Sequence, residues 1–321
     1  MNWLGWQIDY LLLLQNFRDI TGGVFDRFFL SITWFGEIYI PLIFICIMYW
    51  CVNKKSGLFI LWSYLFGFVI NTIMKVTACI YRPWMLSTEI HPVAKAVPAA
   101  TGYSFPSGHT AGCVSIWGGT SMVFWNNKIV RYLCFLIVFL VMLSRNYLGV
   151  HTPQDVIVSL LVGIVILIYT HKLIEWEENG NNRDLIIVSV VTILNILFAL
   201  YVALKSYPMD CVNGELIYNP SNMKCEVCAR TGFVFGAFWG WLIEKRFIGF
   251  DAKIGNILQK IGRFAIGIAS LLLLYKFLQP VFVNSLGHLY GLFATYICIS
   301  LYVTLIYPLL IKQTYLYKTS K

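Results

Sequence analysis

Apolar stretches of about 20 residues with almost no charge recur along the whole chain, and each is long enough to cross a lipid bilayer. Hydrophobic residues make up 59% of the 321 residues, and charged residues make up only 12%. A soluble domain is about one quarter charged. Because a segment in lipid must satisfy its backbone hydrogen bonds internally, these stretches are expected to be helices. The sequence therefore predicts an all-α fold, a polytopic transmembrane helical bundle.

The membrane spans can be placed from the apolar runs, and about nine are expected. They cover residues 37–52, 57–80, 109–125, 130–147, 154–172, 185–204, 227–243, 262–280 and 289–311. The apolar stretches 3–17 and 24–34 precede them and are typical of helices that lie in the membrane interface. We expect three parts: an interfacial amphipathic region at 1–36, a transmembrane core at 37–180 that carries three polar motifs, and an accessory transmembrane region at 181–321.

The excess of positive charge is explained by membrane topology. The chain has 24 Lys and Arg residues against 15 Asp and Glu residues, which gives a net charge of +9. These basic residues are scattered over short loops, as the positive-inside rule predicts, so no nucleic-acid partner is expected. The short basic loop 53–55 is expected to be cytoplasmic, which places the polar motifs on the extracytoplasmic face. A bacterial cell membrane is the expected location of so compact a chain, and a homo-oligomer is left open.

The nine cysteines fall into two groups. Six lie in or near apolar spans, where small inert core residues are expected: Cys46, Cys51, Cys79, Cys113, Cys134 and Cys298. Cys211, Cys225 and Cys228 share one polar loop and could form a disulfide, a metal pair or neither. A disulfide is favoured if this loop is extracytoplasmic. A zinc site would need two further ligands, which the sequence does not offer nearby.

A first polar cluster consists of Lys75 and Arg82, which is followed by Pro83. Two helical turns separate Lys75 from Arg82, so a helix would place both cations on one face. Pro83 disfavours helical geometry at Arg82, and the helix is expected to end about there, with Arg82 at the membrane surface. An Arg fork and a Lys point charge suit phosphate oxygens. The alternative is a pair of cations that snorkel from the end of a span.

A second cluster is Pro106-Ser107-Gly108-His109, which follows a loop rich in Pro, Ala and Gly and precedes an apolar helix. Ser107 is expected to cap that helix, and Gly108 permits close approach of the backbone to a ligand. Free amides at a helix start bind anions, and His109 in the first turn could donate a proton. The alternative is a capped helix whose histidine faces water.

A third cluster runs from Ser144-Arg145 to His151 and Asp155. Thr152 and Asp155 are typical of a helix start with an acidic first turn. Four residues separate His151 from Asp155, so the carboxylate can reach one imidazole nitrogen and make the other a better nucleophile. Arg145 can supply a second phosphate fork. The alternative is that Asp155 only caps the helix.

The chain resembles a known family, the type 2 phosphatidic acid phosphatases or lipid phosphate phosphatases. The matching stretches are Lys75-x6-Arg82-Pro83, Pro106-Ser107-Gly108-His109 and Ser144-Arg145-x5-His151-x3-Asp155. The family shares its site with vanadium haloperoxidases and bacterial acid phosphatases. The resemblance covers about residues 37–172 and implies a phosphatase-type helical core. The later spans form a C-terminal helical extension, which is reminiscent of sphingosine-1-phosphate phosphatases.

The resemblance also implies a role for each motif residue. His151 attacks phosphorus and forms a phosphohistidine, Asp155 orients His151, and His109 protonates the leaving oxygen and then activates water. Five residues hold the phosphoryl oxygens and balance their charge: Lys75, Arg82, Ser107, Gly108 and Arg145. The scheme needs no metal, and no cofactor is expected.

The expected function is a metal-independent phosphatase that hydrolyses a phosphomonoester or diphosphate of a membrane lipid. Candidate substrates are isoprenyl diphosphates, phosphatidic acid, phosphatidylglycerol phosphate and sphingoid-base phosphates, whose tails would stay in the bilayer. Two other functions are left open. A lipid phosphotransferase would use the same phosphohistidine with a hydroxyl group in place of water, and a transporter would carry the motifs as a vestigial site.

Overall fold

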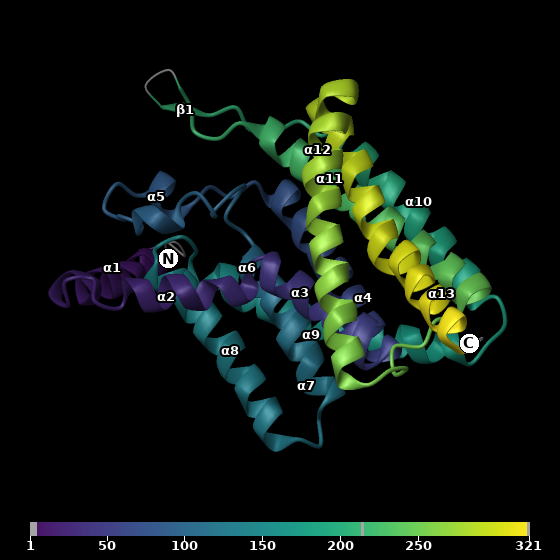
Figure 1. Cartoon of the computed structure of the whole chain (residues 1–321). Helices are drawn as coiled ribbons and strands as arrows, with labels where there is room; N and C mark the ends of the chain where they lie inside the picture. The colour runs from purple at the N-terminus through teal and green to yellow at the C-terminus, as the bar shows by residue number, and fades with distance from the viewer. Residues whose placement is uncertain (1–4, 213–214, 320–321) are drawn as a thin grey trace. The chain divides into compact units, whose positions relative to one another are not determined.

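Almost all of the regular structure is helical (Figure 1). The protein is represented by a computed structural model that describes residues 5–212 and 215–319. Within those ranges the one β element is a pair of two-residue strands, β1 (Cys211–Val212) and β2 (Glu215–Leu216), which pair in antiparallel fashion. The predicted all-α, transmembrane fold class is therefore confirmed.

The helices follow one another along the chain, and η marks a short 3₁₀ or π-helical segment. Before the hairpin lie α1 (Gly5–Ile20), α2 (Asp26–Thr33), η1 (Trp34–Gly36), α3 (Tyr39–Ile47), η2 (Met48–Val52), α4 (Lys54–Ala78), α5 (Pro83–Leu86), η3 (Ala94–Ala96), α6 (Gly108–Cys113), η4 (Val114–Gly118), α7 (Gly119–Val123), α8 (Lys128–Tyr147), α9 (Pro153–Glu178) and α10 (Arg183–Leu204). After it lie α11 (Pro220–Ile243), η5 (Glu244–Ile248), α12 (Ile257–Leu301), η6 (Tyr302–Ile306) and α13 (Tyr307–Thr319).

The chain folds into two compact units, and each is discontinuous in sequence. The first comprises Met1–Leu42, Ile60–Thr170 and Tyr207–Pro220. The second comprises Ile43–Phe59, His171–Ser206 and Ser221–Lys321. All the polar motifs of the sequence belong to the first unit.

Fewer helices than expected are long and apolar enough to cross a membrane. Among the described residues there are five: Lys54–Leu86, Lys128–Tyr147, Pro153–Glu178, Arg183–Leu204 and Ile257–Thr314. Asp26–Gly36 and Tyr39–Val52, bent by 47°, make a sixth if they form one span. The count of nine is not confirmed. One reason is that the predicted span 109–125 consists of three short helical pieces, α6, η4 and α7.

Helix α12 turns back on itself at Gly287, so that its two arms correspond to two of the predicted spans. Its backbone is non-helical at Gly287, where φ is 77° and ψ is 167°. On either side of this residue the chain pairs with itself, since the hydroxyl groups of Ser270 and Tyr302 lie 2.5 Å apart and the rings of Tyr275 and Tyr296 lie 6.2 Å apart. The predicted spans 262–280 and 289–311 are thus two arms joined at a glycine, which alone adopts this conformation without strain.

The end of α4 differs from the prediction. The helix ends at Ala78 rather than near Arg82, because Cys79 adopts a left-handed conformation with φ of 49°. Arg82 is extended, with φ of −69° and ψ of 153°, as expected for a residue before proline. The side chain of Arg82 is buried within the protein.

The favoured disulfide is not present. All nine cysteines lie within the described residues, and all are free. Cys225 instead lies 3.3 Å from Nδ1 of His288, and Cys211 is exposed on β1. Among the described residues, no group of three or more His, Cys, Asp or Glu side chains could hold a metal ion, so no metal pair is found in this loop.

Candidate active site

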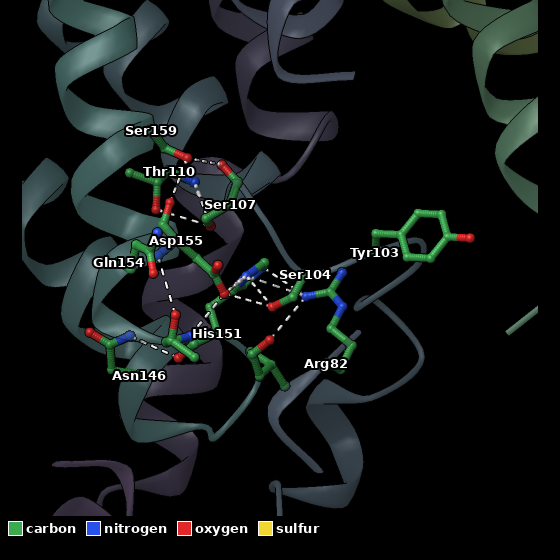
Figure 2. Close-up of polar contacts among 12 residues, drawn as sticks. Arg82, Tyr103, Ser104, Ser107, Thr110, Asn146, His151, Gln154, Asp155 and Ser159 are labelled. Atoms are coloured by element: carbon green, nitrogen blue, oxygen red, sulfur yellow. Dashed lines mark hydrogen bonds and ion pairs between the residues drawn. The ribbon is translucent and has the colours of Figure 1, made fainter. Parts of the chain in front are cut away.

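The three polar clusters, distant in sequence, meet in the first unit (Figure 2). The amide of Ser107 donates to the carbonyl of Asp155 at 3.0 Å, and the hydroxyl of Ser159 donates to the carbonyl of Ser107 at 2.9 Å. These bonds join the second cluster to the third. Arg82 joins the first cluster to the third, because its Nη1 donates to the carbonyl of Val150 at 3.0 Å.

His151 is held between a carboxylate and a guanidinium. Its Nδ1 lies 3.1 Å from Oδ2 of Asp155, and its Nε2 lies 2.8 Å from Nη1 of Arg82. The carboxylate can only accept at Nδ1, so the proton of the neutral ring belongs on Nδ1 and the lone pair on Nε2 faces Arg82. Asn146 fixes the backbone here, since its Nδ2 donates to the carbonyl of His151 at 2.9 Å.

The imidazole of His151 is kept neutral by its surroundings. The side chain is buried between the end of α8 and the start of α9. Burial, followed by the charges of Arg82, Lys75 and Arg145, holds the pKa of His151 well below its usual value of 6.5. A neutral imidazole keeps the unprotonated Nε2 lone pair that a nucleophile requires, and in this structure that lone pair faces Nη1 of Arg82.

One oxygen of Asp155 also organises the start of α9. Oδ2 accepts from the amide of Thr152 at 2.9 Å and from the hydroxyl of Ser104 at 2.6 Å. In return the amide of Asp155 donates to the hydroxyl oxygen of Thr152 at 3.4 Å. The two bonds between Thr152 and Asp155 form a reciprocal cap at the helix start that the sequence predicted from these residues.

Lys75 and Arg82 are buried beside the loop 101–104. Lys75 Nζ donates to the carbonyls of Tyr103 at 2.6 Å and Ser104 at 3.1 Å. Arg82 donates from Nε to the carbonyl of Gly102 at 3.1 Å and from Nη2 to that of Thr101 at 2.6 Å. Backbone carbonyl dipoles therefore fix both cations close to His151, on whose imidazole their charges act.

Arg145 has buried donors without partners. Its side chain is fully buried, and Nη1 donates to the hydroxyl oxygen of Thr33 at 2.6 Å. Nε and Nη2 have no hydrogen-bond partner among the described residues. A buried cation with two unpaired donors is unfavourable unless an anion satisfies them, and a phosphoryl group matches the fork.

His109 and its neighbours start helix α6. Ser107 caps this helix, because its Oγ accepts from the amide of Thr110 at 3.3 Å. Gly108 lies against Lys75, whose Cε would be 4.0 Å from a Cβ at this position. His109 Nε2 lies 3.6 Å from Oε1 of Glu37, which is an ion-pair distance rather than a hydrogen bond.

Four residues at the site were missed from the sequence. They are Thr33, Glu37, Ser104 and Asn146. Three of them are small polar residues that carry no local signal. Glu37 could have been found from the sequence, because it is a charged residue next to apolar stretches. A charge in a membrane segment is costly, so its presence there suggests a functional role.

Comparison with known proteins points to one family. A family model described as the PAP2 superfamily matches residues 56–179. Undecaprenyl-diphosphatase BcrC of Bacillus subtilis (strain 168) is 32% identical over 148 residues, which are 45% of this chain and 72% of that protein. The chain belongs to the PAP2 superfamily. A second model, described as the transmembrane extension of a PAP2 superfamily phosphatase, matches residues 228–319. The prediction of a membrane phosphatase family with a C-terminal helical extension is therefore confirmed.

Two other relatives carry names that refer to different phosphate substrates. The undecaprenyl-diphosphatase of Sulfolobus acidocaldarius is 30% identical over 111 residues, 35% of this chain and 52% of that protein. The lipid A 4'-phosphatase of Porphyromonas gingivalis is 28% identical over 170 residues, 50% of this chain and 70% of that protein. The chain thus spans only about half the length of the Sulfolobus relative. No solved structure was found to match it.

Proposed function

We propose that this PAP2 superfamily member is an integral membrane phosphatase that hydrolyses a phosphomonoester or diphosphate of a membrane lipid. The observation that carries the proposal is the buried His151, which lies between Asp155 and Arg82 and feels the charge of Arg145, two donors of which have no partner among the described residues. A nucleophile, a residue that orients it and a charged phosphate cradle are the parts that phosphoryl transfer needs.

In the first step, Nε2 of His151 attacks phosphorus and forms a P–N bond while the P–O bond to the leaving group breaks. Asp155 keeps the Nδ1 proton in place and stabilises the cationic ring that forms. His109 gives a proton to the leaving oxygen, which departs as an alcohol or, from a diphosphate, as the lipid monophosphate.

In the second step, a water molecule attacks the phosphohistidine. His109, neutral after the first step, takes a proton from this water, and the P–N bond breaks to release inorganic phosphate and neutral His151. In both steps the negative oxygens on phosphorus are held by Lys75, Arg82 and Arg145, with Ser107 and Gly108 shaping the same cradle. Since these cations are built into the protein, the scheme uses no metal ion.

The names of the relatives favour an isoprenyl diphosphate as the first substrate to test. Two relatives are named undecaprenyl-diphosphatases and a third is named a lipid A 4'-phosphatase. We place the site at the extracytoplasmic face of a cell membrane, because the basic loops favour the cytoplasmic side.

The test is phosphate release from purified protein in detergent over four lipid classes: an isoprenyl diphosphate, phosphatidic acid, phosphatidylglycerol phosphate and a sphingoid-base phosphate. The wild type is expected to release phosphate from at least one class, and His151→Ala from none. His171→Ala is the matched control, because His171 is half-exposed on α9 and lies outside the site. Equal release by wild type and His151→Ala would contradict the proposal.

A further inference from the structure

The segment from Asp26 to Glu37 contacts the candidate active site, although it lies outside the PAP2 superfamily match at 56–179. Asp26 Oδ1 accepts from the hydroxyl of Tyr147 at 2.9 Å, two residues beyond Arg145. Thr33 contacts Arg145, and Glu37 contacts His109. One short stretch therefore reaches two of the residues to which the proposed mechanism gives a role.

The backbone brings Glu37 to His109 by close packing. Gly36 lies so near the first turn of α6 that a Cβ at this position would be 2.5 Å from the carbonyl oxygen of His109. The side chains of both partners are mostly buried, with 13% of His109 and 25% of Glu37 exposed. The carboxylate is thus held at the imidazole by the fold, and solvent screens the pair less than it would on a surface.

Burial is the largest influence against the protonated form of His109, and the cations around it act in the same direction. The charges of Arg145 from α8 and of Arg82 from the loop before α5 both disfavour a positive charge on its imidazole. A positive charge on His109 in turn disfavours one on His151. Glu37 is the carboxylate that pairs with His109 among the described residues. A nearby carboxylate favours imidazolium, whereas nearby cations favour neutral imidazole.

We propose that Glu37 is a positioning residue, which orients His109 and favours the protonated ring that delivers a proton to the leaving oxygen. This inference rests on the proposed phosphatase function and deepens it. His109 Nε2 is buried without a hydrogen-bond partner and faces Glu37, which leaves Nδ1 to exchange the proton. After the transfer, His109 is neutral with its Nε2 proton toward Glu37, and Nδ1 can accept a proton from water.

The experiment compares kcat, KM and pH profiles of Glu37→Gln, Glu37→Asp and His109→Ala with the wild type, using phosphate release from an isoprenyl diphosphate in detergent. Glu37→Gln is expected to lower kcat by about 10- to 100-fold and to change KM by less than about 3-fold, as loss of general acid catalysis would. The alkaline limb of the kcat profile should move to lower pH, because without the carboxylate the ring loses its proton more readily.

Two further variants separate positioning from a structural role. In the double variant Glu37→Gln/His109→Ala, kcat should be no lower than in His109→Ala, because Glu37 acts through His109. Glu37→Asp keeps the charge and should keep the alkaline limb near that of the wild type. Glu89→Gln makes the same chemical change at an exposed carboxylate of the first unit and should leave all parameters unchanged.

The outcomes distinguish this inference from the proposed function. If His151→Ala stays active, the phosphohistidine itself is wrong. If His151→Ala is inactive while Glu37→Gln matches the wild type, only the inference about Glu37 is wrong. It is also wrong if Glu37→Gln lowers kcat equally at every pH, or if its effect adds fully to that of His109→Ala. If Glu37→Gln folds poorly, Glu37→Asp provides the test. A large displacement of the alkaline limb of its kcat profile from that of the wild type would overturn the inference about Glu37.

Discussion

At the scale of single residues, Arg145 shows how a side chain can be placed for an anion. Its guanidinium is fully buried, and within the described part of the chain only Nη1 is paired, with Thr33. A lysine at this position would keep the charge but lose the planar fork that the unpaired Nε and Nη2 offer to a phosphoryl group.

We therefore expect Arg145→Lys to lower kcat/KM by about 10- to 100-fold, which corresponds to the loss of one charge-assisted hydrogen bond. Phosphate-release kinetics would measure this. Arg27→Lys on the exposed side of α2 is the control and should behave as the wild type. A kcat/KM for Arg145→Lys within about 2-fold of the wild type would argue against a bidentate contact.

The neutral state of His151 has a consequence for stability. Its pKa is lowered in the folded protein by burial and by nearby cations, so below about pH 6.5 the unfolded chain binds more protons than the folded one. Protonation then favours unfolding. The melting temperature of the wild type should fall, relative to that of His151→Gln, as the pH is lowered from 7 to 5. A constant difference between the two melting temperatures over this range would mean that His151 is not neutral in the folded state.

At the scale of elements, η1 and α6 approach each other closely at the site. A Cβ on Gly36 would meet the backbone of His109 at 2.5 Å, and backbone cannot move aside as a flexible side chain can. Gly36→Ala should therefore separate the two elements, lower the melting temperature and reduce phosphate release at least about 10-fold, through displacement of His109.

Gly262→Ala is the matched control for this variant. Gly262 lies within α12, where nothing is within 4 Å of an added Cβ. Alanine there should raise the stability slightly, since alanine favours a helix by about 1 kcal/mol over glycine. If Gly36→Ala kept both the melting temperature and the activity of the wild type, the packing of η1 on α6 would be unimportant for the site.

The sequence predicted most elements because helix signals are local. Apolar runs gave the helices, and the spacing of Thr152 and Asp155 gave the start of α9. The ends of the spans and their number were harder to predict from the sequence. The turn at Gly287 depends on the two arms of α12 packing on each other, and the early end of α4 depends on the conformation of Cys79.

The site was predictable where its residues form motifs and not where its contacts cross the chain. Family resemblance pointed to His151, Asp155 and the cations. Thr33 and Ser104 could not be found in this way, because they contact residues 112 and 51 positions away. A single serine or threonine in a loop gives no sign of such a distant partner.

At the scale of the whole molecule, the proposed chemistry predicts a distinct pattern of inhibition. Orthovanadate can adopt the five-coordinate geometry of phosphorus in the transition state, so it should inhibit phosphate release in competition with the lipid substrate. A chelator such as EDTA should leave the rate unchanged, because the cations of the scheme are Lys and Arg side chains. Loss of activity in EDTA that magnesium restores would contradict a metal-independent mechanism.

Topology is a second property of the whole chain. With the motifs on the extracytoplasmic face, a membrane-impermeant thiol reagent added to intact cells should label Cys211, which is exposed and free. Cys46 is fully buried and should not react, so Cys211→Ser should reduce the labelling whereas Cys46→Ser should not. If Cys211 were labelled only after the membrane is opened, the proposed orientation of the chain would be wrong.

The same oxygen atom of Asp155 caps α9 and holds the imidazole of His151. In the proposed mechanism, the reactivity of His151 therefore depends on the integrity of one helical turn. Opening of that turn should stop the proposed reaction for as long as it lasts, even though the rest of the bundle stays folded. Hydrogen exchange at the amide of Thr152 would report the fraction of molecules ready to react.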